Sequence, residues 1–95
     1  MSVLDQFCLK GKIALITGGS SGIGEAIAEA QGLAGAQVIL AARRKVQLEE
    51  ARTRLASKNV RVLACIPADL SDLNACTALA EQALAHAGRV DILVK

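Results

Sequence analysis

The sequence contains no tyrosine and no tryptophan, and Phe7 is its single aromatic residue. Proteins that bind single-stranded nucleic acid stack bases on aromatic side chains that lie among basic ones, and this chain lacks that combination. Its only basic cluster, residues 43–45, is too short to indicate a nucleic-acid surface. The net charge is +2, with acidic and basic residues interspersed. We therefore expect no nucleic-acid partner.

Cysteine is also scarce: Cys8, Cys65 and Cys76 are odd in number and far apart. This spacing supports neither a disulfide framework nor a zinc site, so we expect small apolar cysteines in a reducing compartment and no metal. Residues 1–12 lack the apolar stretch of a signal peptide, and no run approaches the length of a membrane span. The expected location is the cytoplasm, without a membrane partner.

Apolar residues are abundant, at 53% of the chain, which is enough for a folded core. Four short runs of them are apolar on both faces, as in strands of a parallel sheet that helices cover on each side. These predicted strands are residues 13–16, 38–42, 62–66 and 92–94.

Three stretches between these runs have apolar residues at helical spacing, namely 22–33, 46–57 and 71–87. Ser71 is a candidate N-cap of the third helix, Asp72 would lie in its first turn, and Gly88 would end it. Right-handed crossovers then predict an α/β fold, a Rossmann-type doubly wound parallel sheet of about four strands in the order 3-2-1-4. Gly32 lies inside the first helix, where glycine is less favourable than alanine, and no sequence pattern explains it.

A glycine-rich turn follows the first strand and opens the first helix, with the sequence Thr17-Gly18-Gly19-Ser20-Ser21-Gly22-Ile23-Gly24. Gly18 lets the chain turn sharply, Gly22 leaves room for a pyrophosphate, and Gly24 allows the helix to pack closely on the sheet. The hydroxyls of Ser20 and Ser21 and the first amides of the helix would donate hydrogen bonds to phosphates. A glycine turn without a ligand is the alternative. The strand before it and the helix after it favour a dinucleotide site.

The end of the second strand indicates which dinucleotide is preferred. An acid there binds the ribose hydroxyls of NAD, whereas an arginine accommodates the extra phosphate of NADP. This strand ends in Ala42-Arg43-Arg44, without an acid. Arg43 is the candidate partner of a 2′-phosphate, and Arg44 is equally well explained as a solvated loop residue. We therefore expect NADP(H) to be preferred over NAD(H).

Asp69 and Leu70 follow the third strand, at the sheet edge where ligands of this architecture bind. The Asp69 carboxylate would accept a hydrogen bond from the adenine amino group, and Leu70 would cover the ring. Asp69 is also suited to starting the next helix, and both roles can hold together.

With these motifs the sequence resembles the N-terminal part of a short-chain dehydrogenase/reductase. The resemblance rests on residues 17–24, on Asp69-Leu70 and on the Asp-Ile-Leu-Val segment at 91–94, and it covers nearly the whole chain from Lys10. It implies an oxidoreductase that moves a hydride between NADP(H) and an alcohol or carbonyl, with residues 1–95 as part of its NAD(P)-binding Rossmann domain. It also implies ligand contacts at Gly18, Ser20, Ile23, Gly24, Arg43, Asp69 and Leu70.

The sequence also departs from that family. The family continues the fourth strand with Asn-Asn-Ala-Gly, where this chain has Lys95, and the family's catalytic Ser and Tyr-x-x-x-Lys have no counterpart. We therefore expect no catalytic residue in this chain, and either a fragment or a truncated gene product. The later helices that usually form the oligomer interface of full-length relatives would be missing as well.

Two other functions stay open at this point. One is a non-catalytic nucleotide-binding fragment. The other is a methyltransferase-type Rossmann domain, which would need an acid after the second strand, where Ala42 and Arg43 lie. His86, the only histidine, is better explained by its place near the end of the third helix than as a catalytic base.

Overall fold

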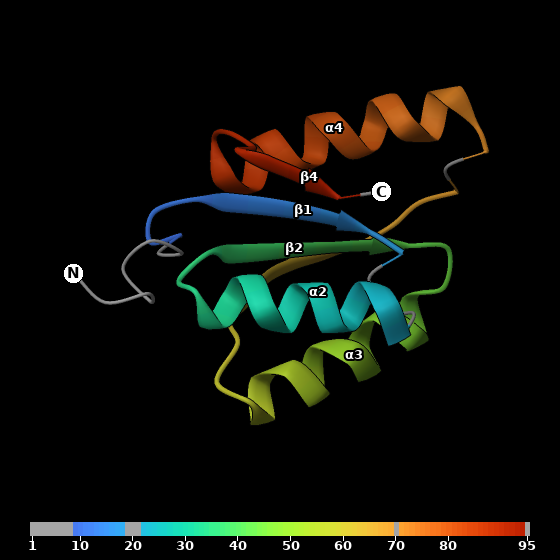
Figure 1. The fold of residues 1–95 in the computed structure, drawn as a ribbon. Helices are drawn as coiled ribbons and strands as arrows, with labels where there is room; N and C mark the ends of the chain where they lie inside the picture. Colours follow the sequence, from blue (N-terminus) through green and yellow to red (C-terminus); the bar gives the residue numbers. More distant parts are fainter. Residues whose placement is uncertain (1–8, 19–21, 70, 95) are drawn as a thin grey trace.

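The computed structural model describes residues 9–18, 22–69 and 71–94, and the chain forms one sheet with helices on both faces (Figure 1). The elements in chain order are β1 (Ile13–Thr17), α2 (Gly22–Leu33), β2 (Gln37–Ala42), α3 (Lys45–Ser57), β3 (Val62–Pro67), α4 (Leu73–Ala87) and β4 (Ile92–Val94).

The four strands are all parallel and lie in the order β3-β2-β1-β4, which confirms the predicted topology. β1 is central: Ile16 pairs with Leu40 of β2 on one side and with Val94 of β4 on the other. Because every strand runs in the same direction, all carboxyl ends meet at one edge of the sheet. The loops after β1, β2 and β3 therefore gather at that edge.

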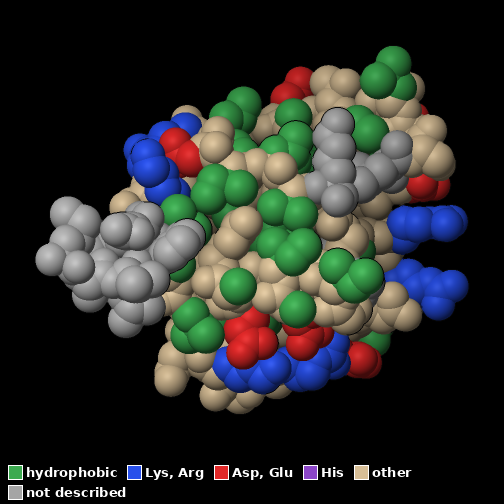
Figure 2. Space-filling model, viewed as in Figure 1, with side chains coloured by type: hydrophobic (Ala, Val, Ile, Leu, Met, Phe, Trp, Pro, Cys, Tyr) green, Lys and Arg blue, Asp and Glu red, His purple; other side chains and the backbone are tan. Residues whose placement is uncertain are grey.

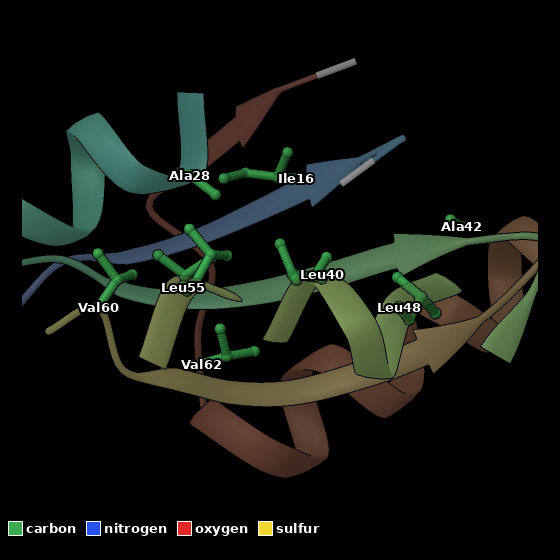
Figure 3. Close-up of a cluster of buried hydrophobic side chains, with 10 residues drawn as sticks. Ile16, Ala28, Leu40, Ala42, Leu48, Leu55, Val60 and Val62 are labelled. Atoms are coloured by element: carbon green, nitrogen blue, oxygen red, sulfur yellow. The ribbon is translucent and has the colours of Figure 1, made fainter. Parts of the chain in front are cut away.

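The sheet buries both of its faces, which is why the strands read as continuous apolar runs. On one face, Ile16 and Leu40 pack with Leu48 and Leu55 of α3, as Figure 3 shows. Ala28 of α2 belongs to the same cluster. On the other face, Leu79 and Ala83 of α4 pack on strand residues, namely Ile13, Leu15, Ile39, Ala41, Ala64 and Ile66.

The start of α4 differs from the prediction. Asp72, not Ser71, is the N-cap: its carboxylate accepts the amide hydrogen of Asn74 at 2.9 Å. Ser71 lies one position before this cap, and its hydroxyl donates to the Asp69 carboxylate. Gly88 ends the helix as predicted, and its amide donates to the carbonyl of Leu84.

The apolar face predicted for α4 is only partly buried. Leu79 and Ala83 are covered, but Leu73 is 80% exposed and Leu84 is 50% exposed. The helix covers the β3 side of the sheet with a narrow stripe, and apolar positions beside that stripe face outward. Periodicity identifies the apolar side of a helix, but the width of the buried stripe depends on the neighbouring elements.

Gly32, unexplained by the sequence, lies in α2 against Val60, in the loop before β3. A Cβ atom at position 32 would overlap the Val60 side chain, which is only 1% exposed. A glycine is therefore required for α2 to approach this loop so closely.

Two ion pairs join α2 to α3 on the surface. Glu25 pairs with Arg54 at 2.6 Å, and Glu29 pairs with Lys58 at 3.2 Å. Figure 2 shows acidic and basic side chains meeting on this side of the molecule. The hydrogen bonds from Arg54 hold the pKa of Glu25 below its usual range.

The short strand β4 is attached to β1 at both ends. At one end, the Asp91 carboxylate accepts the amide hydrogen of Ile13 at 2.8 Å and pairs with Arg89 at 3.0 Å. Arg89 also donates to the carbonyl of Gly11. At the other end, the hydroxyl of Thr17 donates to the carbonyl of Val94 at 2.9 Å. These contacts hold a strand of three residues in register.

Candidate functional site

A cavity of about 470 Å³ opens at the carboxyl edge of the sheet, within the size range of small-molecule sites. The loops after β1, β2 and β3 all contribute to it. Its lining residues are Gly18, Ala42, Arg43, Arg44, Gln47, Ala68, Asp69 and Ser71. Of the predicted site residues, the cavity wall thus brings together Gly18, Arg43, Arg44 and Asp69.

The described ends of the turn after β1 have the geometry that their glycines indicate. Gly18 has a φ of +71°, which residues with a Cβ rarely adopt, and its amide donates to the carbonyl of Ala41 at 2.8 Å. Among the described residues, and apart from chain neighbours and the backbone of α2, no atom lies within 4 Å of where a Cβ would stand at Gly18 or Gly22. Gly24 is buried in α2. The positive φ of Gly18 and the burial of Gly24 are the features that a dinucleotide-binding turn requires of these two glycines.

The remaining residues of the motif lie away from the cavity wall or outside the described part of the chain. Ile23, at the start of α2, is 79% exposed. The Thr17 hydroxyl is used in the bond to Val94, so this side chain connects the turn to β4. Ser20, Ser21 and Leu70 lie outside the residues that the structure describes.

One wall of the cavity is basic. Arg43 and Arg44 follow β2 and are both exposed, and Arg44 is the N-cap of α3 without a side-chain capping bond. The first turn of α3, all of it described, contains no acidic residue. Two guanidinium groups therefore lie at the positive end of the α3 dipole, and that combination favours an anionic ligand.

The cavity wall also carries a carboxylate, Asp69. Its Oδ1 accepts hydrogen bonds from the Ser71 hydroxyl at 2.7 Å and from the Ser71 amide at 3.0 Å. These two bonds, with a further contribution from the charge of Arg43, hold the pKa of Asp69 below its ordinary value. The group stays ionised at neutral pH and suits a ligand that donates a hydrogen bond.

Sequence reasoning missed two polar lining residues, Gln47 and Ser71, and the two alanines of the wall, Ala42 and Ala68. Gln47 is the third residue of α3, so it lies in the same first turn that follows the arginines. Ser71 stands two positions after Asp69, the spacing at which an aspartate commonly accepts a bond from the following backbone. Both positions follow from the predicted elements, but only the folded structure shows that they face one cavity.

Neither a metal-binding cluster nor a membrane-spanning helix occurs in the described residues. No cluster of three or more histidine, cysteine or acidic side chains that could hold a metal ion occurs within 9–18, 22–69 and 71–94. Over the same ranges, no helix is both long and apolar enough to cross a membrane. Cys65 and Cys76 are half-buried and not in a disulfide, and burial raises the pKa of the Cys65 thiol. Cys8 lies outside the described residues.

Comparison with known proteins identifies relatives across nearly the whole chain. The family described as short chain dehydrogenase matches residues 12–95. The dehydrogenase/reductase SDR family protein 7-like of Anopheles gambiae is 47% identical over 90 residues, which cover 90% of this chain and 28% of that protein. The chain therefore spans less than a third of the length of this curated relative.

Two solved structures with bound nicotinamide cofactors share the fold. The Pseudomonas aeruginosa RhlG/NADP complex has a TM-score of 0.81 and 44% identity, over 92% of this chain and 34% of that one. A 7α-hydroxysteroid dehydrogenase in complex with NADH and 7-oxo glycochenodeoxycholic acid has a TM-score of 0.87 and 32% identity, over 98% of this chain and 36% of that one. The two similar proteins thus hold different forms of the nicotinamide dinucleotide.

Proposed function

Because the chain belongs to the short-chain dehydrogenase family, we propose that it forms the NADP(H)-binding part of an oxidoreductase acting on alcohol or carbonyl groups. The cofactor would supply or accept the hydride. The residues of this chain would bind its phosphates and its adenosine and hold them at the carboxyl edge of the sheet.

The observation that carries the preference for NADP(H) is the basic wall of the cavity. Arg43 and Arg44 line it, and no acid stands at the end of β2 to bind the ribose hydroxyls of NAD. A 2′-phosphate would take a charge-assisted pair from Arg43 close to the positive end of α3. An acid in that place would repel the same phosphate.

The pyrophosphate and the adenine of the cofactor would fit other residues at the carboxyl edge of the sheet. The turn that contains Gly18 and Gly22 suits the pyrophosphate, with the exposed Ile23 beside it. The ionised Asp69, which lines the same cavity as the arginines, suits the amino group of adenine. The contacts proposed for Ser20, Ser21 and Leu70 rest on the sequence motif.

Titration by isothermal calorimetry with NADPH and NADH tests this proposal. The unmodified chain should bind NADPH more tightly, and Arg43→Ala should lose roughly ten- to hundredfold in NADPH affinity with little change for NADH, as expected for a hydrogen bond to a charged group. Arg61→Ala, an exposed arginine before β3 and outside the cavity, is the matched control and should leave both affinities unchanged. Equal or tighter binding of NADH by the unmodified chain would contradict the preference.

A second experiment separates cofactor binding from catalysis. Reduction of a carbonyl needs a placed proton donor, and the 95 residues contain no tyrosine to serve as one. The purified chain should therefore bind NADPH but show no turnover with a panel of alcohols and ketones, followed by the absorbance of the reduced nicotinamide. Turnover that survives repurification and is lost in Gly22→Val would show that the chain catalyses the reaction itself.

A further inference from the structure

The carboxylates of Asp69 and Asp72 are held in similar turns, which differ in one hydrogen-bond donor, the hydroxyl of Ser71. Each carboxylate accepts the amide hydrogen of the residue two positions later, Ser71 at 3.0 Å and Asn74 at 2.9 Å. Only Asp69 also accepts a hydroxyl hydrogen, from Ser71 at 2.7 Å. Because the amide bond alone supports the turn at Asp72, the hydroxyl of Ser71 is not needed to shape the chain.

The extra bond acts on the orientation of the carboxylate. Two donors of Ser71 converge on Oδ1 of the exposed Asp69, so they restrict the rotation of the carboxylate and leave Oδ2 without a bond to Ser71. Asp69 and Ser71 both line the cavity, whereas Asp72 does not. A carboxylate that is already oriented loses less conformational freedom when it binds a ligand, and it accepts a hydrogen bond only from a donor in a defined direction.

We propose that Ser71 is a positioning residue, which holds the Asp69 carboxylate so that the cavity selects a base with an exocyclic amino group over a base with a carbonyl oxygen in the same place. This inference rests on the proposed function, because it requires a dinucleotide in this cavity. Adenine donates from its amino group to the carboxylate. Hypoxanthine has an oxygen there, and a fixed carboxylate repels it.

The test measures the affinities of the full chain for NADPH and for its hypoxanthine analogue, which differ at this position of the base. Isothermal calorimetry gives the ratio of the two affinities. In the unmodified chain the ratio should favour NADPH by about tenfold or more, the effect of one hydrogen bond to a charged group. Asp69→Asn should bring the ratio close to one.

Ser71→Ala keeps the amide donor and removes only the hydroxyl. The ratio should fall severalfold, through weaker binding of NADPH and little change for the analogue. Ser71→Thr restores a hydroxyl and should restore the ratio. Ser57→Ala is the matched control, since the Ser57 hydroxyl donates to the carbonyl of Arg54 at the end of α3, outside the cavity.

The possible outcomes separate the inference from the proposed function. An unchanged ratio in Ser71→Ala, equal weakening of both nucleotides, or a low ratio in Ser71→Thr would overturn the role of Ser71 and leave NADPH binding intact. Failure of the unmodified chain to bind either nucleotide would instead refute the proposed function, and the inference with it.

Discussion

Position 32 is a glycine because the side chain of Val60 occupies the space that a Cβ atom would need. Alanine is normally the better helix former, so Gly32→Ala in an isolated helix would stabilise it by about 0.5–1 kcal/mol. Here the added methyl group would overlap Val60, which is buried and branched and cannot move aside. We expect Gly32→Ala to destabilise the chain by about 1–3 kcal/mol, as overpacked cores do.

A double-mutant cycle with Val60→Ala, followed by urea denaturation, measures this clash. In the Val60→Ala background, Gly32→Ala should cost much less than it does in the unmodified chain, because the overlapping methyl groups are gone. Additive effects of the two substitutions would contradict the proposed overlap. Ala56→Gly, at an exposed position of α3, gives the effect of helix propensity without the clash.

The candidate site was predictable where a residue with suitable chemistry directly follows a predicted strand. Gly18, Arg43 and Asp69 each follow a predicted strand, and parallel strands bring such positions to one edge. Thr17 belongs to the glycine-rich motif, but its hydroxyl is used by β4, a partner 77 positions away in the chain. Contacts over such separations depend on the register of the strands, which the sequence motif does not contain.

At the scale of elements, the three helices and four strands were predictable because each type carries its own periodicity. Runs apolar on both faces fit strands covered on two sides, and β4 (Ile92–Val94) has the predicted bounds. The prediction of which α4 residues are buried was less accurate, since Leu73 and Leu84 are exposed. A helical pattern reports which side is apolar, whereas coverage depends on which elements lie next to it.

The attachment of β4 to β1 gives a pH dependence at the element scale. The pKa of Asp91 is lowered by the hydrogen bond from the Ile13 amide and by the ion pair with Arg89, with Lys12 adding positive charge nearby. A carboxyl whose pKa is lower in the folded than in the unfolded chain stabilises the fold at neutral pH. That contribution is lost as the pH falls below the ordinary carboxyl pKa of about 3.9 and through the lowered one.

Thermal melts across the acid range test this linkage. Asp91→Asn should melt below the unmodified chain at neutral pH, and the difference should shrink as the pH falls through the lowered pKa. The control is Glu81→Gln, which removes an exposed carboxylate on α4. A difference between Asp91→Asn and the unmodified chain that stays constant down to low pH would rule out the proposed contribution.

At the scale of the whole molecule, β4 is an edge strand with an apolar side chain exposed. It pairs with β1 on one side, and Leu93 is 54% exposed. Apolar side chains also gather in the middle of the face seen in Figure 2, between α2 and α4. Open strand edges with apolar side chains promote pairing with other chains. We therefore expect the 95-residue chain by itself to be marginally stable and to self-associate.

Sedimentation velocity over a range of concentrations measures this association. Leu93→Lys should shift the chain toward the monomer, because a charged side chain on an edge strand opposes pairing. Leu33→Lys, at an exposed leucine that ends α2, should have a smaller effect. A monomer at high concentration with a cooperative melt well above room temperature would contradict both the expected self-association and the expected marginal stability.

The placement of the two cavity arginines has a consequence for how the proposed cofactor preference can be changed. Arg43 and Arg44 are solvent-exposed and follow β2 without taking part in either buried cluster. Substitutions there would alter the charge of the cavity wall and leave the packing of the sheet intact. We therefore expect the proposed cofactor preference to be changed by a few substitutions that leave the fold stable, whereas a side chain at Gly18 or Gly32 would strain the backbone or the packing.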